Sequence, residues 1–142
     1  MTRLVLSFGI YMRFAHRHGP RTRWRDADGR WHVRGRVERF HEPALLLLLQ
    51  ERPAHGYELV DRLGELIPGE RPELGGIYRI LRALEEDGLV TSEWDADEPG
   101  PAKRRYELTP AGRGLLRAWA KALTETHKVV EAFVRRYGKE VS

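Results

Sequence analysis

The sequence predicts a mainly α-helical fold with one small two-stranded β wing and a long C-terminal helix. Apolar residues recur at helical spacing up to residue 84, change to a strand-like pattern between residues 89 and 108, and return to helical spacing from residue 110. The expected elements follow the order of a winged helix-turn-helix: two short helices, a turn-rich link, a third amphipathic helix and a hairpin directly after it. We therefore expect a winged helix-turn-helix domain followed by a long dimerisation helix.

Length and composition exclude several classes of protein. The 142 residues suffice for one cored domain with an extension, and the absence of cysteine excludes disulfides, thiolate zinc sites and a cysteine nucleophile. The longest apolar run, residues 44–49, is far too short to span a bilayer, and the N-terminus lacks the small-residue cleavage site of a signal peptide. We expect a cytoplasmic protein with no membrane partner.

The charge is divided unevenly along the chain. Residues 1–40 hold ten arginines, no lysine and three acidic residues, whereas the rest of the chain is slightly acidic. We expect a basic, largely flexible arm at 1–40, the winged domain at 41–108 and the dimerisation helix at 109–142. A basic arm beside a near-neutral body favours a polyanion partner, nucleic acid first. The arm either adds phosphate contacts or is a solvated tail, and its Asp28-Gly29 turn predicts a hairpin over residues 24–33.

An apolar run and the residues expected at the helix ends predict the first two helices. Pro43 suits the first turn of a helix whose following residues, 44–49, are apolar all round and therefore buried. A second helix is expected from about Ala54 to Ile67, with leucines facing inward. Residues 68–72 are rich in proline and glycine and connect it to the third helix.

The third helix, from Gly75 to a C-terminal Gly88, is the candidate recognition helix. Its apolar stripe recurs from residue 77 to residue 84. The other face carries Tyr78, Arg79 and Arg82 in its first half and acidic residues in its second half. A helix that enters DNA by its N-terminal end favours this polarity. We expect these three side chains to face the major groove, where an arginine can read a guanine edge.

The hairpin that follows carries a basic cluster just past its tip. Strands are expected over residues 89–94 and 103–108, joined by a loop of acidic, proline and glycine residues. The return strand begins with Lys103, Arg104 and Arg105. Next to a recognition helix, such a cluster favours contact with DNA phosphates, although it could also be merely solvated.

The last helix starts with Thr109 as N-cap and Pro110 at the first helical position, and is expected to reach about Tyr137. It has two apolar stripes, of which a small domain can cover only one. The other predicts a homodimer. The expected interface consists of Leu116, Trp119, Leu123, Val130, Val134 and Tyr137.

Three spaced motifs resemble the PadR family of bacterial and archaeal transcriptional regulators. They are His55-Gly56-Tyr57-Glu58-Leu59, then Gly75-x-Ile77-Tyr78 with Leu81-x-x-Leu84-Glu85-x-x-Gly88-Leu89-Val90, and finally Gly100-Pro101-x-Lys103-Arg104-x-Tyr106-x-Leu108-Thr109 followed by Gly112. The resemblance covers Ala44 to about Tyr137. It implies a winged-helix dimer joined through the C-terminal helix, usually a repressor of palindromic operators. Some members release DNA on binding small aromatic compounds.

The resemblance also assigns roles to single residues. It places Tyr57 near a phosphate, Tyr78 on the recognition helix, and Lys103 with Arg104 as the basic pair of the wing. The chain departs from the family at Gly76, where Thr or Ser is usual, and at Arg79, where Pro is frequent. These departures leave open which bases are read.

The functional prediction is a DNA-binding transcriptional regulator, a homodimeric repressor that a small aromatic effector releases. Trp119 and Leu123 would line the effector pocket, and the competing interpretation, which we favour, is that Trp119 is a buried core residue. The alternative is a non-specific RNA-binding or nucleoid module led by the arginine-rich arm. We expect no enzyme activity, cofactor or metal, because the sequence has no nucleophile with a base, no metal-spaced cluster and no phosphate-cradling glycine loop.

Overall fold

The computed structural model describes residues 23–33, 35, 37, 39–68, 72–95 and 103–141. The first 22 residues of the predicted arm, and with them any test of its flexibility, lie outside the described residues. The chain divides into two compact units, Arg39–Thr124 and a second that joins Met1–Glu38 with Glu125–Ser142. We describe each unit by itself.

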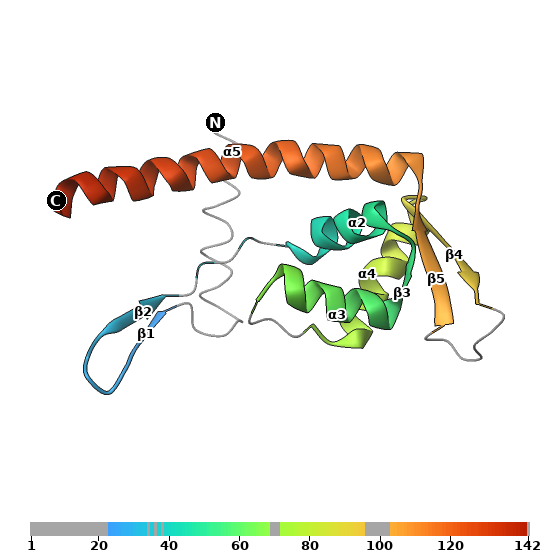
Figure 1. Cartoon of the computed structure of the whole chain (residues 1–142), viewed down its shortest axis with the longest axis horizontal. Helices are drawn as coiled ribbons and strands as arrows, with labels where there is room; N and C mark the ends of the chain where they lie inside the picture. Colours follow the sequence, from blue (N-terminus) through green and yellow to red (C-terminus); the bar gives the residue numbers. More distant parts are fainter. Residues whose placement is uncertain are drawn as a thin grey trace. The chain divides into compact units, whose positions relative to one another are not determined.

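The larger unit contains three helices and a small antiparallel sheet (Figure 1). Its elements are α2 (His41–Glu51), β3 (Ala54–His55), α3 (Gly56–Leu66), α4 (Leu74–Glu86), β4 (Val90–Trp94), β5 (Arg104–Leu108) and the first part of α5 (Pro110–Val141). This arrangement confirms the predicted mainly helical fold with a β wing and a long last helix.

The core is formed where the apolar faces of the helices meet the sheet. Leu45 and Leu46 of α2 are fully buried, as the all-apolar run predicts. The other most deeply buried side chains are Leu59, Leu63, Ile77, Leu81, Leu84 and Val90. Burial of this apolar surface, at about 25 cal/mol per Å², is the main force that holds α4 against the rest of the domain.

A third strand, β3, extends the predicted two-stranded wing. The sheet order is β3-β5-β4, and Ala54 pairs with Tyr106 while His55 pairs with Arg105. His55 is also the N-cap of α3, with φ −80° and ψ 158°. An N-cap residue has extended backbone angles, so the same conformation starts the helix and adds a strand to the sheet.

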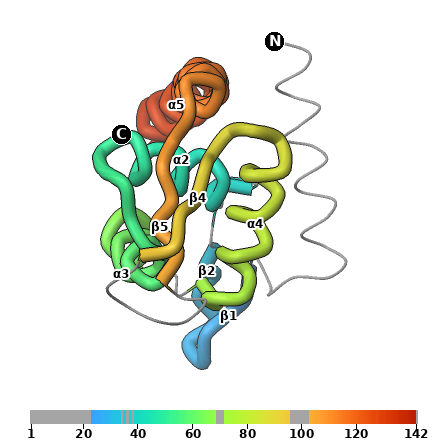
Figure 2. The backbone as a smooth tube through the Cα atoms, turned by 90° about the vertical axis from the view of Figure 1, so that its right-hand side faces the viewer, coloured from blue at the N-terminus to red at the C-terminus, as the bar shows by residue number. Residues whose placement is uncertain are grey.

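Backbone and side-chain hydrogen bonds fix both ends of the wing. Helix α4 ends at Glu86 and is followed by Gly88, whose φ is +73°, and the N–H of Leu89 donates to the carbonyl of Leu84 at 2.8 Å. This is a Schellman ending, which needs a left-handed residue and therefore favours glycine. Figure 2 shows β4 leaving the end of α4 and β5 returning to the start of α5.

Thr109 links the two ends. Its Oγ1 donates to the Gly88 carbonyl at 2.8 Å and accepts the Gly112 N–H at 3.1 Å, which confirms Thr109 as the N-cap of α5. The base of the wing is thus held to the end of α4. Ser92 on β4 also donates to a Glu85 carboxylate oxygen of α4 at 3.0 Å.

The smaller unit contains the hairpin of the N-terminal segment and the last part of α5. Strands β1 (Arg23–Arg25) and β2 (Trp31–Val33) pair antiparallel, which confirms the predicted hairpin. The Asp26 carboxylate closes its turn by accepting the N–H groups of Asp28 at 2.9 Å and Arg30 at 3.0 Å.

Candidate nucleic-acid interface

Helix α4 presents two arginines on the face opposite its buried stripe. Ile77, Leu81 and Leu84 are at most 2% exposed. Arg79 and Arg82 are exposed, and neither makes a hydrogen bond or ion pair with any residue that the structure describes. Their guanidinium groups are therefore available to a partner.

Tyr78 lies in a different environment from these arginines. Its ring packs against the core, and its hydroxyl is buried without a hydrogen-bond partner among the described residues. Burial, with a smaller contribution from Tyr57, raises the pKa of the Tyr78 phenol. A Cβ at Gly56 would lie 2.7 Å from the ring, so the first residue of α3 makes room for it. Tyr78 thus positions α4 against α3, and its contact with DNA stays a prediction.

The three basic residues of the wing are not equivalent. The Lys103 ammonium lies 5.0 Å from the centre of the Tyr57 ring. The Arg104 guanidinium lies 5.0 Å from the centre of the Trp94 ring, and its Nε is buried. Arg105 points away from the core and is exposed. Stacking on Trp94 and the burial of its Nε leave Arg104 less free than Arg105 to reach a phosphate.

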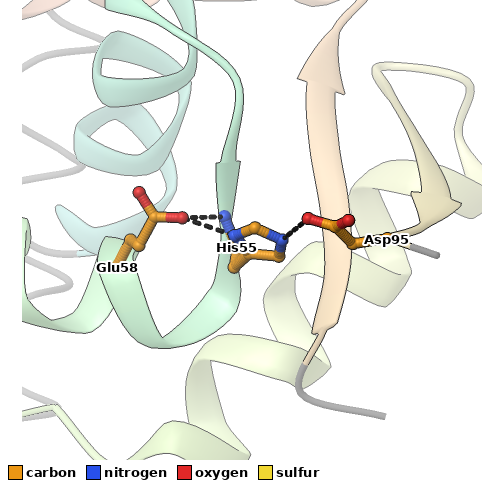
Figure 3. A network of polar contacts seen from close by, with 3 residues as sticks. All are labelled: His55, Glu58 and Asp95. Atoms are coloured by element: carbon orange, nitrogen blue, oxygen red, sulfur yellow. Dashed lines mark hydrogen bonds and ion pairs between the residues drawn. The ribbon is translucent and has the colours of Figure 1, made fainter. Parts of the chain in front are cut away.

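A histidine held between two carboxylates joins the wing to α3 (Figure 3). Nδ1 of His55 lies 2.5 Å from Oε1 of Glu58, which also accepts the His55 backbone N–H at 3.1 Å. On its other side, Nε2 lies 2.9 Å from Oδ2 of Asp95, the residue that follows β4. The His55 ring stacks on the Tyr57 ring, with centroids 5.5 Å apart.

The electrostatics of this cluster favour the imidazolium form. The hydrogen bond to Glu58 is the main cause that raises the pKa of His55, and the bond to Asp95 adds to it while burial opposes it. Reciprocally, the His55 hydrogen bond is the main cause that lowers the pKa of Glu58. Both carboxylates therefore face a cation over a wider pH range than an ordinary histidine would provide.

Sequence reasoning did not single out this cluster. The spacing of His55 and Glu58 is that of an N-cap and an N3 glutamate, which is a recognisable signal for a capping box. Asp95 carries no such signal, because it lies 40 residues further along the chain.

The residues of the last helix that are predicted to form the dimer interface fall into two groups. Leu116 is 9% exposed and belongs to the core of its own unit, and Trp119 and Leu123 are partly buried. Val130, Val134 and Tyr137 are exposed by 44%, 59% and 60%. Only the second group leaves a substantial apolar surface on the helix.

Trp119 lies beside a hollow of about 410 Å³ that Leu123 also lines, together with α2 and α3 residues such as Leu47 and Leu66. The Trp119 indole N–H donates to Glu42 at 2.7 Å. Both readings of Trp119, as a packing residue and as part of a pocket wall, fit this position.

Within the described parts of the chain, no group of three or more His, Asp or Glu side chains is arranged to hold a metal ion. None of the helices described is long and apolar enough to cross a membrane.

Three helices followed directly by an antiparallel hairpin define the class of winged helix-turn-helix proteins. Residues 45–118 match the family described as "Transcriptional regulator PadR-like family". The chain belongs to this family, whose members are transcriptional regulators rather than enzymes.

Individual relatives agree with this membership. Over 85 residues the chain is 36% identical to transcriptional regulator Rv3488 of Mycobacterium tuberculosis, covering 60% of this chain and 70% of that protein. The crystal structure of a conserved protein, a potential transcriptional factor, matches with a TM-score of 0.63 at 36% identity, over 76% of this chain and 97% of that one. Bacillus subtilis PadR in complex with operator DNA matches with a TM-score of 0.52 at 26% identity, over 58% of this chain and 47% of that one. The predicted family and fold are confirmed.

Proposed function

We propose that this PadR-family regulator is a homodimeric repressor that binds a palindromic operator in double-stranded DNA. The observation that carries the proposal is the pair Arg79 and Arg82, exposed on α4 and without partners in the described part of the chain. The operator complex of the related Bacillus subtilis PadR supports DNA as the partner. Two unpaired guanidinium groups on one helix face fit the guanine edges of a major groove.

The surrounding residues would set the register on the duplex. Lys103, Arg105 and Tyr57 are at least partly accessible at the wing and at the start of α3, and would contact phosphates. Arg104 would contribute positive charge from its place on Trp94. Tyr78 would act through the placement of α4.

Helix α5 would join the two subunits. Val130, Val134 and Tyr137 expose apolar surface along it, and pairing with a second copy would remove that surface from water. Trp119 and Leu123 would continue the interface, whereas Leu116 has its partners within its own subunit. A two-fold dimer requires paired half-sites about one or two helical turns apart.

A small aromatic effector would bind in the hollow beside Trp119 and Leu123. That hollow touches both α2 and α5, so a ligand there could change how the dimerisation helix carries the winged domain. Release of the operator would follow if the two recognition helices lost their spacing.

The test compares specific with non-specific binding. Operator fragments are selected from the source genome, and fluorescence anisotropy then measures affinity for operator and random duplex at several salt concentrations. Arg82→Ala should weaken operator binding by about 1–3 kcal/mol per half-site while changing random-duplex binding much less. Lys103→Ala should weaken both alike and reduce the salt slope by about one unit per subunit.

Arg117→Ala, which removes an exposed cation from α5, is the matched control and should leave the operator preference unchanged. If Arg82→Ala bound the operator as tightly as the wild type, the recognition face would be misplaced.

A second candidate is non-specific nucleic-acid binding led by the N-terminal arm. Its support is the β1–β2 hairpin, where the guanidinium groups of Arg23 and Arg25 lie 5.8 and 4.3 Å from the centre of the exposed Trp31 ring. Arginine and tryptophan together can bind phosphates and stack on bases.

A further inference from the structure

Four residues near the tip of the wing and the start of α3 form a closed cycle of contacts. The His55 imidazole bonds the Asp95 carboxylate, and the Asp95 backbone N–H donates to the Lys103 carbonyl at 3.0 Å. The Lys103 ammonium lies over the Tyr57 ring, which stacks back on His55. Asp95 and Lys103 are also the last described residues on either side of the loop at the wing tip.

Two of these four residues, Tyr57 and Lys103, are the ones assigned to DNA phosphates above. Neither is fixed by its own secondary structure alone, because Tyr57 lies in the first turn of α3 and Lys103 precedes β5. The two residues touch each other directly, and the strand ends that carry Asp95 and Lys103 are tied to the start of α3 by the His55 ring, whose side chain is only 12% exposed. A change at His55 would therefore move both phosphate contacts together.

We infer that His55 is a positioning residue for DNA binding: as an imidazolium it donates to Glu58 and Asp95 at once, and so holds the wing at the distance from α3 that lets Tyr57 and Lys103 contact the phosphate backbone. This inference rests on the proposed function, since it concerns the geometry of that interface. This role goes beyond the helix cap and the sheet. The cap uses the backbone of His55 and its contacts with Glu58, the sheet uses only its backbone, and neither uses the bond from Nε2 to Asp95.

The two-sided contact requires both ring nitrogens to carry a proton. A neutral imidazole has one N–H and one lone pair, so one carboxylate would then face a lone pair and repel it. The pKa of His55 is raised, chiefly by Glu58, so the clamp holds below that pKa and opens as the pH rises through it. Operator affinity should therefore fall with rising pH in this range.

Other charged groups near the His55 ring do not replace the imidazolium charge. Charged or titratable groups face the cluster from α3, from the end of β4, from β5 and from the segment before β3; they are Glu58, Tyr57, Asp95, Glu93, Lys103, Arg105 and Arg52. Arg105 and Glu93 are a cross-strand pair of opposite charge, and Arg52 acts on Glu58. Of this set, His55 is the group expected to change charge near neutral pH.

The experiment uses the full-length protein and measures operator affinity between about pH 5.5 and 8.5 at constant ionic strength. The variants are Asp95→Asn and His55→Gln, with Asp61→Asn on the exposed side of α3 as control. Circular dichroism checks that each variant is folded. NMR follows the titration of the His55 ring in the free protein.

Wild-type affinity should fall about five- to tenfold across the range, as expected for loss of one charge-assisted hydrogen bond. Asp95→Asn and His55→Gln should bind weakly throughout, with a flat profile in this range. Simple electrostatics predicts the opposite for Asp95→Asn, because removing an acid beside DNA should strengthen binding. Asp61→Asn should stay within about twofold of the wild type and keep its pH profile.

The possible failures are distinguishable. If the wild type showed no preference for any selected operator over random duplex, the proposed function would fail and the inference with it. If it preferred the operator, but Asp95→Asn bound equally well or better with an unchanged pH profile, only the positioning role of His55 would be overturned. A His55 titration that did not shift in Asp95→Asn would also overturn it.

Discussion

At the scale of single residues, identical side chains serve different purposes in this chain. Arg79 and Arg82 are exposed and without partners in the described structure, whereas Arg104 lies on Trp94. Arg62 is tied to the end of α2 through the Leu48 carbonyl at 2.9 Å. Environment, not residue type, therefore separates the arginines that we propose to contact DNA from those that hold the fold together.

The same contrast holds for two neighbouring glycines of α5, and it makes a prediction. A Cβ at Gly112 would lie 2.1 Å from the Leu89 carbonyl oxygen and 2.5 Å from Cδ1 of Leu108, whereas one at Gly114 would meet nothing within 4 Å. Gly112→Ala should therefore lower the free energy of unfolding by about 1–3 kcal/mol. Gly114→Ala should raise it by about 0.5–1 kcal/mol, because alanine favours a helix interior.

Urea unfolding of both variants measures the two changes. The close approach at Gly112 joins the start of α5 to the base of the wing. Gly112→Ala would push these two segments apart and should therefore also increase backbone motion at the base of the wing. Equal effects of the two substitutions would contradict this account of the junction.

At the scale of elements, α5 has two parts with different surroundings. Leu116 contributes to the core of the winged domain, while Val129, Val130, Phe133 and Val134 are between 44% and 71% exposed. The polar side of the same stretch carries ion pairs, such as Arg135 with Glu131 at 3.1 Å. One apolar and one charged side on a single helix is the pattern of a helix that pairs with a partner.

Val134→Glu should therefore convert a dimer into a monomer, because it buries a charge at the centre of the proposed interface. Sedimentation velocity measures the state at several protein concentrations. Lys128→Glu, which introduces the same side chain on the polar side, should leave the dimer intact. A monomeric wild type, or a dimeric Val134→Glu, would show that α5 does not join the subunits.

At the scale of the whole molecule, the family match begins at residue 45, and the basic arm precedes it. The arm holds ten of the 25 basic residues but only three of the 21 acidic ones, and its hairpin exposes Trp31 by 58%. The winged domain and the arm are therefore the parts of the chain on which the two proposed functions depend. The predicted boundaries at residues 40 and 108 stay predictions.

Deletion of residues 1–36 discriminates the two proposed functions. A regulator led by α4 should keep its preference for the operator and lose mainly non-specific affinity and salt dependence, because the arm supplies phosphate contacts. A module led by the arm should lose nearly all binding. Anisotropy titrations with operator and random duplex, before and after deletion, provide the measurement.

Local patterns in the sequence determined most of the fold. Apolar periodicity located the helices, Gly88 and Thr109 marked where α4 ends and α5 begins, and Asp28-Gly29 located the N-terminal hairpin. These features are predictable because they depend on residues within a few positions of one another. The exposed arginines of α4 follow from the same periodicity.

Only the tertiary structure decided how these elements meet. It added β3 to the sheet, turned Tyr78 towards Gly56, placed Leu116 in the core and brought Asp95 to His55. Each of these contacts joins residues that are distant along the chain, and a periodic or capping signal in one segment does not say which distant residue it will meet. Their partners are set by the packing of helices on the sheet, which the spacing of residues in one segment does not contain.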